Sequence, residues 1–296
     1  MSPSKEIKKE YSPIKTLVGD ASRSIRIPKS IIEDTDIHNV RLSLFTYLSI
    51  YKGLNNKVCF SIPLFLEWAG YKNDSHSGGI NDKVIETLIA LSEWGYVIFL
   101  DDKPLTRSYC AELRFDTDLV HNMCYEESFA ILYLDEITRI MQYTNNNTHD
   151  RRLNRNTVLL VFAFLRQAIF RTPNTLKPEE RSPEGIAARR ERCIEAYNSN
   201  YKEIALVLGL GEKTVSAAVD ILTKLKLIVF AEAYRIRNAD GEYRTQDIIF
   251  ANMEKREGDK LLAIGKSYAL PEIERKERRI QKYIPNYKIR KTIYFS

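Results

Sequence analysis

The chain has 296 residues, of which 44% are hydrophobic and 28% are charged, values typical of a globular protein with about two domains. Its longest apolar run, Val158–Leu165, is far shorter than the ~20 residues of a membrane-spanning helix. We see no apolar segment typical of a signal peptide near Met1, and the four cysteines form no CxxC pair. These features exclude fibrous, disordered and membrane-spanning classes, and they favour a cytoplasmic protein with reduced thiols.

The basic charge is concentrated at the two ends of the chain. Residues 1–30 carry a net charge of +4 and residues 252–296 a net charge of +6, which leaves −4 for residues 31–251. Basic ends on a neutral-to-acidic body favour a polyanionic partner that is held partly by the ends. The alternative is a solubilising surface without a polyanionic partner.

One pattern of elements is predicted twice. In chain order it is a first helix, a short strand, a second helix, a turn, a third helix and a two-stranded hairpin. The periodicity of apolar residues and the turn residues place the first set at 40–51, 57–60, 61–70, 81–94, 96–100 and 109–115. A further strand at 129–134, a helix at 135–143 and a linker near 145–148 follow.

The second set repeats the spacing of the first. The apolar stripe Val84, Leu88 and Leu91 recurs 131 residues later as Val215, Val219 and Leu222, and the strand 96–99 recurs as 227–230. A second hairpin then turns at Asp240-Gly241. The copies differ in the turn before the third helix, which has 13 residues between Gly70 and Val84 but only five between Gly209 and Val215.

We therefore expect a mainly α fold with small β wings, an α+β protein. The predicted parts are a basic N-terminal arm at 1–30, a first domain at 31–145, a second domain at 155–251 with a helical insert near 171–195, and a basic C-terminal tail at 252–296 with a helix at 271–284.

The segments Phe60–Val97 and Tyr201–Leu227, with their hairpins, resemble tandem winged helix-turn-helix proteins. Among these, the replication initiators of low-GC plasmids and phages are similar in size, two-unit plan and basic tail. The resemblance implies a sequence-specific protein that binds origin repeats in double-stranded DNA as a homodimer and engages host replication proteins. A transcriptional regulator at an operator is the alternative, and a protein-interaction scaffold that binds no DNA is the second alternative.

In a helix-turn-helix, the N-terminal part of the recognition helix meets base edges in the major groove, and wing side chains contact the backbone or minor groove. In the second unit the predicted contacts are Lys213, Thr214, Ser216, Ala217, Arg235, Arg237, Asn238 and Arg244. In the first unit they are Ser75, His76, Ser77, Asn81, Lys83, Lys103 and Arg107, with Asn81 suited to adenine.

Two further features of the first unit bear on its role. Its third predicted helix is more acidic than that of the second unit, which favours dimerisation as an alternative to DNA contact. Arg23 and Arg26 lie in a segment with the composition of a minor-groove arm, and the same segment is equally compatible with an edge strand packed on the first unit.

The sequence offers no pattern typical of catalysis. The four histidines form no metal-binding cluster, and His121-x-x-Cys124 with Cys110 upstream lacks the paired spacing of a zinc site. The adjacent carboxylates Asp101-Asp102 suit a turn better than a two-metal site, and there is no Walker lysine. We therefore predict a protein that is not an enzyme, with no metal and no cofactor.

Overall fold

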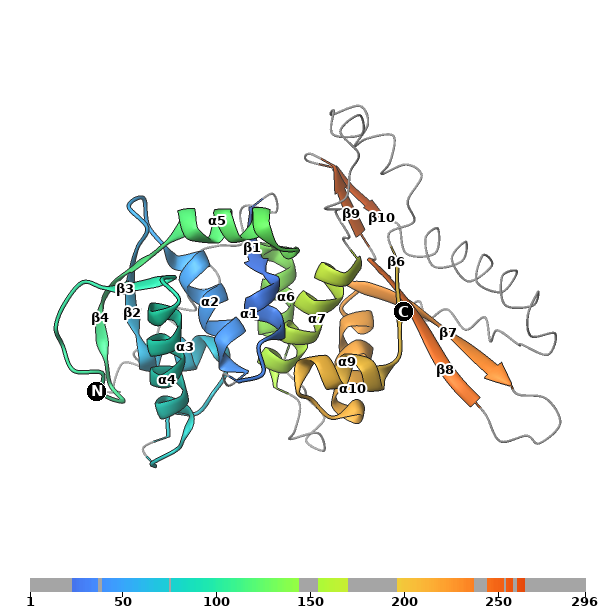
Figure 1. Cartoon of the computed structure of the whole chain (residues 1–296), viewed down its shortest axis with the longest axis horizontal. Helices are drawn as coiled ribbons and strands as arrows, with labels where there is room; N and C mark the ends of the chain where they lie inside the picture. Colours follow the sequence, from blue (N-terminus) through green and yellow to red (C-terminus); the bar gives the residue numbers. More distant parts are fainter. Residues whose placement is uncertain are drawn as a thin grey trace, which may run out of the picture.

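The computed structural model describes residues 23–36, 39–74, 76–143, 154–169, 196–236, 244–252, 254–257 and 260–263. The protein is a mixed α/β chain with small antiparallel sheets (Figure 1). Its helices are α1 (Lys29–Glu33), α2 (Val40–Tyr51), α3 (Ile62–Ala69), α4 (Ile80–Glu93), α5 (Thr117–Glu126), α6 (Leu134–Gln142), α7 (Arg155–Ile169), α9 (Tyr201–Leu208) and α10 (Glu212–Lys224).

Two three-stranded sheets share one topology. The first has the order β2-β4-β3 and the second has the order β6-β8-β7, so in both the first strand lies at an edge and the last strand lies in the centre. Their strands are β2 (Lys57–Ser61), β3 (Val97–Phe99), β4 (Cys110–Phe115), β6 (Ala196–Ser199), β7 (Ile228–Ile236) and β8 (Arg244–Asn252). We call residues 40–115 the first unit and residues 155–252 the second unit.

The apolar residues that recur after 131 positions in the sequence occupy equivalent core positions in the two units. Val84, Leu88 and Leu91 of α4 are fully buried, and so are Val215, Val219 and Leu222 of α10. The backbone after both helices also matches, because the N–H of Tyr96 bonds to the Leu91 carbonyl and the N–H of Leu227 bonds to the Leu222 carbonyl. Equivalent side chains therefore set the same helix-to-strand turn in both units.

Glycine ends the second helix of each unit. Gly70 after α3 has φ of +75° and Gly209 after α9 has φ of +63°, a left-handed conformation that other residues adopt at a cost of roughly 1 kcal/mol or more. The end of the first unit's helix predicted at 61–70 is confirmed at Gly70. Ser61 is the N-cap residue of α3, although its side chain makes no capping hydrogen bond.

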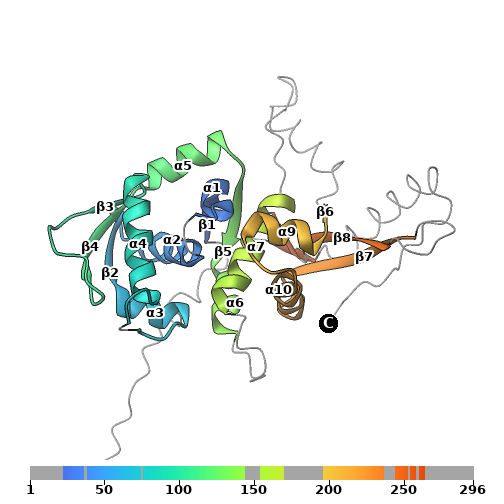
Figure 2. The ribbon, with the colours of Figure 1, turned by 60° about the horizontal axis from the view of Figure 1, so that its bottom comes forward.

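The first helices of the two units pack against each other in the middle of the molecule. All residues from Val40 to Ile50 of α2 and from Asn156 to Ile169 of α7 are buried. A helix that is buried on every side must be surrounded by other elements. Figures 1 and 2 show α1, α2, α6 and α7 between the two three-stranded sheets, so the described parts of both units share one continuous core.

Buried polar groups connect the elements of this shared core. The Ser43 hydroxyl donates to the Asn156 side-chain oxygen, and Asn156 Nδ2 donates to the Ala69 carbonyl at 3.0 Å. Arg166 of α7 forms a buried ion pair with Glu136 of α6. The two predicted domains are thus joined by hydrogen bonds and an ion pair as well as by apolar contact.

The predicted N-terminal arm is in part an element of the body. Strand β1 (Ser24–Pro28) pairs antiparallel with β5 (Phe129–Tyr133), and Ile25 and Ile27 point into the core. Of the two interpretations left open for this segment, the edge strand is the correct one. The fully buried Arg41 donates to the carbonyls of Ile31 and Ile32 at the end of α1, and burial lowers the pKa of its guanidinium to about 10.

Some elements were not predicted. Helix α5 begins after Asp116, whose carboxylate accepts from the Leu119 N–H at 2.8 Å. A hairpin of β9 (Glu254–Glu257) and β10 (Lys260–Ala263) begins what was predicted to be a tail. The predicted insert at 171–195 and the helix at 271–284 lie outside the described residues.

Candidate nucleic-acid interface

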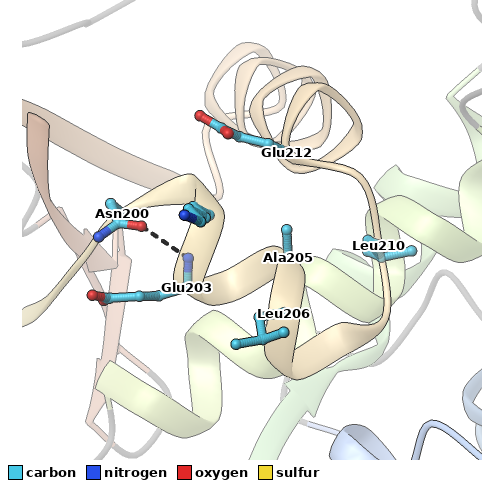
Figure 3. A pocket seen from close by; sticks show the side chains of 7 residues that line it. Asn200, Glu203, Ala205, Leu206, Leu210 and Glu212 are labelled. Atoms are coloured by element: carbon cyan, nitrogen blue, oxygen red, sulfur yellow. Dashed lines mark hydrogen bonds between the residues drawn. The ribbon is translucent and has the colours of Figure 1, made fainter.

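The second unit presents a helix–turn–helix formed by α9 and α10. The Asn200 side chain accepts from the Glu203 N–H at 2.8 Å and so caps α9 at its start (Figure 3). Gly209 ends α9, and after Leu210 the chain enters α10 with Gly211 at the N-cap. The turn is short, since only these three residues separate the two helices.

The outer face of α10 is small and polar in its first half. Val215, Ala218, Val219 and Leu222 are buried. Glu212, Lys213, Asp220 and Lys224 are exposed, and Ser216 and Ala217 are half-buried. Side chains as short as serine and alanine let another molecule approach the helix backbone. Lys213 stands at the N-terminal end of this face, where the positive end of the helix dipole adds to its charge.

The structure brings the predicted residues of α10 together. Lys213 is exposed, and Thr214, Ser216 and Ala217 are half-buried within the next turn. The Thr214 N–H is already bonded to the Gly211 carbonyl at 2.9 Å, so its hydroxyl rather than its backbone is the group available to a ligand. These four residues form one compact surface.

The hairpin of the second unit is long. β7 and β8 pair over nine residues each, with Arg235 opposite Thr245 and Ile236 opposite Arg244, so both predicted arginines lie at the far end of the hairpin. Arg237 and Asn238 lie outside the described residues. Figure 1 shows β7 and β8 extending away from α9 and α10.

The corresponding end of α4 in the first unit is built differently. Asn81, predicted to serve adenine, is 1% exposed, so its side chain is inaccessible to a base and that prediction is wrong. Its Oδ1 accepts from the Asp74 N–H at 2.9 Å, and its Nδ2 donates to Asn73 Oδ1 at 2.7 Å and to the Arg107 carbonyl at 3.0 Å. Asn81 therefore holds the long turn against the hairpin.

The predicted wing residue Arg107 is engaged within the protein. Its Nε donates to Asp82 Oδ1 at 2.7 Å and its Nη2 to Asp82 Oδ2 at 2.9 Å. These bonds and the Gly78 N–H lower the pKa of the Asp82 carboxyl to about 2. A DNA phosphate that approached Arg107 would have to compete with this carboxylate.

The outer face of α4 carries three acidic residues, one of which, Asp82, is paired with Arg107. Opposite its buried residues lie Asp82, Glu86, Ile89 and Glu93. Glu86 and Glu93, which form no ion pair within the described residues, repel the phosphates of DNA, whereas the exposed residues of α10 carry two lysines, Lys213 and Lys224, against Glu212 and Asp220. The two units thus share a topology but differ in the charge of their third helix.

The remaining predicted contacts of the first unit are scattered. His76 and Ser77 are exposed, Lys83 is half-buried, and Ser75 lies outside the described residues. The exposed Lys103 pairs with Asp101 at 3.2 Å. Arg23 and Arg26 are both exposed; Arg26 lies within β1 of the β1–β5 ribbon, and Arg23 directly precedes it.

A shallow groove of about 470 Å³ lies beside the turn of the second unit. Leu206, with 82% of its surface exposed, stands at its rim, and Ala205 and Leu210 line its apolar part (Figure 3). Lys202, Glu203 and Glu212 add charges of both signs. Sequence reasoning missed this groove, because the apolar stripe of α9 gave no sign that one leucine faces outward.

Within the described residues, no group of three or more potential ligands is placed to hold a metal ion, and no helix is both long and apolar enough to cross a bilayer. Searches among known protein families and among curated proteins find no family or relative that matches the chain.

Proposed function

We propose that the protein binds double-stranded DNA through α10, and that its two units are tandem winged helix-turn-helix domains. The observation that carries this proposal is the outer face of α10, where Lys213 precedes the short side chains of Ser216 and Ala217. A major groove about 12 Å wide admits a helix, and short residues on its face let it lie against base edges.

The shared topology of the units supports the same proposal. In each unit a helix, a strand and two helices precede a two-stranded hairpin, and the sheet orders are equivalent. In this arrangement the hairpin of the second unit is the wing. Arg235 and Arg244 at its far end would contact the DNA backbone or the minor groove while α10 occupies the major groove.

The acidic residues of α4 support placing the DNA contact in the second unit. Because Asp82, Glu86 and Glu93 lie where the first unit would meet phosphates, this unit is better suited to contact protein than DNA. The homodimer expected from the sequence fits such a division of roles.

Initiation of plasmid or phage replication is the finer part of the proposal, and it rests on the resemblance described above. A transcriptional regulator would use the same contacts at an operator. Footprinting of the full-length protein on DNA around its own gene separates the two. Protection of several short direct repeats supports an initiator, and protection of a single palindrome over a promoter supports a regulator.

Binding measured at 50 and 200 mM salt tests DNA binding itself. With about 6–10 phosphate contacts, the affinity should fall by about a thousandfold or more between these salt concentrations. Absence of any duplex binding at 50 mM salt would contradict the proposal and favour the protein-interaction scaffold.

A further inference from the structure

A continuous row of rings and a guanidinium lies on the surface where α5 crosses β1. The Arg26 guanidinium stands over the Phe129 ring at 5.5 Å from its centroid, and its Nη1 lies 3.3 Å from His121 Nδ1. The His121 ring meets the Tyr125 ring edge to face, with centroids 4.9 Å apart. We call these four residues the Arg26 row.

The Arg26 row faces solvent over most of its length. Tyr125 is 75% exposed, Arg26 and His121 are exposed, and Phe129 is half-buried. A tyrosine ring exposed to this extent contributes little to the core. Arg26 points outward because side chains alternate along β1 and its neighbours Ile25 and Ile27 point inward. The row thus places the rings of Phe129, His121 and Tyr125 beside one guanidinium at the surface.

Further cations lie at the start of α5. Lys52 Nζ donates to Thr117 Oγ1 at 3.0 Å. Burial lowers the pKa of this ammonium group, and the positive charge of the nearby Arg23 lowers it further. The nearby acidic residues are Asp116, whose carboxylate caps α5, the exposed Asp118 and Glu126, and Glu127, whose Oε1 accepts from the N–H and the hydroxyl of Ser30. Two arginines and a lysine thus lie beside the rings along the contact between α5 and β1.

Single-stranded nucleic acid fits this surface. Its unpaired bases stack on exposed rings and on arginine, while cations beside the rings track the phosphates. A duplex keeps its bases stacked on each other and offers no base face to Tyr125. An acidic peptide would use the cations but would leave the exposed rings without a role.

We propose that the Arg26 row is a binding surface for single-stranded nucleic acid, separate from α10. In Figure 1, α5 runs along the upper edge of the first unit, whereas α9 and α10 lie at the lower side of the second unit. Binding of a single strand by the Arg26 row is therefore independent of duplex binding by α10, and an experiment can contradict either one without the other.

The test is a fluorescence-anisotropy titration of the full-length protein with a labelled 20-nucleotide oligothymidylate at 50 mM salt. Loss of one stacked base weakens binding by about fivefold or more, so Tyr125→Ala should show at least this loss while Tyr125→Phe stays near the wild type. Arg26→Gln should also weaken binding. Circular dichroism checks that each variant is folded.

Two matched controls lie in the first unit and outside the Arg26 row. Trp94→Ala removes another partly exposed ring, and Arg114→Gln removes another exposed arginine, and neither should change the affinity for the oligonucleotide. No binding by the wild type, or unchanged binding by Tyr125→Ala, would overturn the inference. So would an equal loss in Lys213→Ala, because the strand would then lie on α10.

Discussion

The buried ion pair between Glu136 and Arg166 offers a quantitative test of the shared core. Its side chains are 2% and 3% exposed, and it joins α6 to α7. Arg166→Met keeps most of the side-chain length but leaves the Glu136 carboxylate buried without its cation. Breaking such a pair from one side costs about 3–5 kcal/mol, a large part of the roughly 5–15 kcal/mol by which a protein of this kind is stable.

A second substitution should recover part of this loss. Glu136 Oε2 also accepts from the Tyr133 N–H at 2.9 Å, a bond that the amide oxygen of glutamine can retain. Glu136→Gln added to Arg166→Met removes the buried charge, so the double variant should be more stable than Arg166→Met by about 1 kcal/mol or more.

Urea unfolding followed by circular dichroism measures the three free energies of unfolding. Lys57→Met is the control, because its pair with Glu112 is exposed and should be worth less than about 1 kcal/mol. A loss below about 1 kcal/mol in Arg166→Met would refute the reasoning, as would a double variant less stable than the single one. Either result would mean that water reaches Glu136.

Three further predictions follow from particular residues. Lys226 has φ of +56° at the position where the first unit has Gly95, so Lys226→Gly should stabilise the protein by about 0.5–1 kcal/mol and Gly95→Ala should destabilise it by about 1 kcal/mol in thermal unfolding. The folded-state pKa of Asp82 is lowered to about 2 from 3.8, so its contribution to stability is complete above pH ~4 and is lost as the pH falls towards 2. The melting temperature of Asp82→Asn should therefore fall less than that of the wild type between pH 5 and 2.5, and an equal fall in both would contradict this. Lys213→Ala combined with Arg237→Ala should weaken binding to the footprinted DNA without loss of folding, and wild-type affinity in that variant would show that the contacting surface lies elsewhere.

Local patterns were sufficient to predict most elements. The stripe of Val84, Leu88 and Leu91, its repeat in α10, and the glycines at 70 and 209 depend on interactions within a few residues, and the structure confirms them. For the same reason the exposed position of Lys213 could be inferred, since it lies opposite a buried stripe on one helix.

Side-chain roles in the first unit could not be predicted in this way. Asn81 and Arg107 were assigned to DNA because asparagine and arginine suit base edges and phosphates. Their partners in the structure lie seven to 26 residues away, in the turn and the hairpin for Asn81 and in α4 for Arg107. No periodicity reveals that a polar side chain is enclosed by segments so distant in the chain.

The sequence by itself determined the order of the elements, the repeat of one unit and the position of the basic residues, because these follow from spacing and composition. The tertiary structure alone decided that α2 and α7 bury all their faces in one core, that β1 belongs to the body, and that Phe129, Arg26, His121 and Tyr125 form a surface row. The physical reason is that burial and contact depend on which segments meet after folding, and here those segments lie up to about a hundred residues apart, from β1 to β5 and α5 and from α2 to α7.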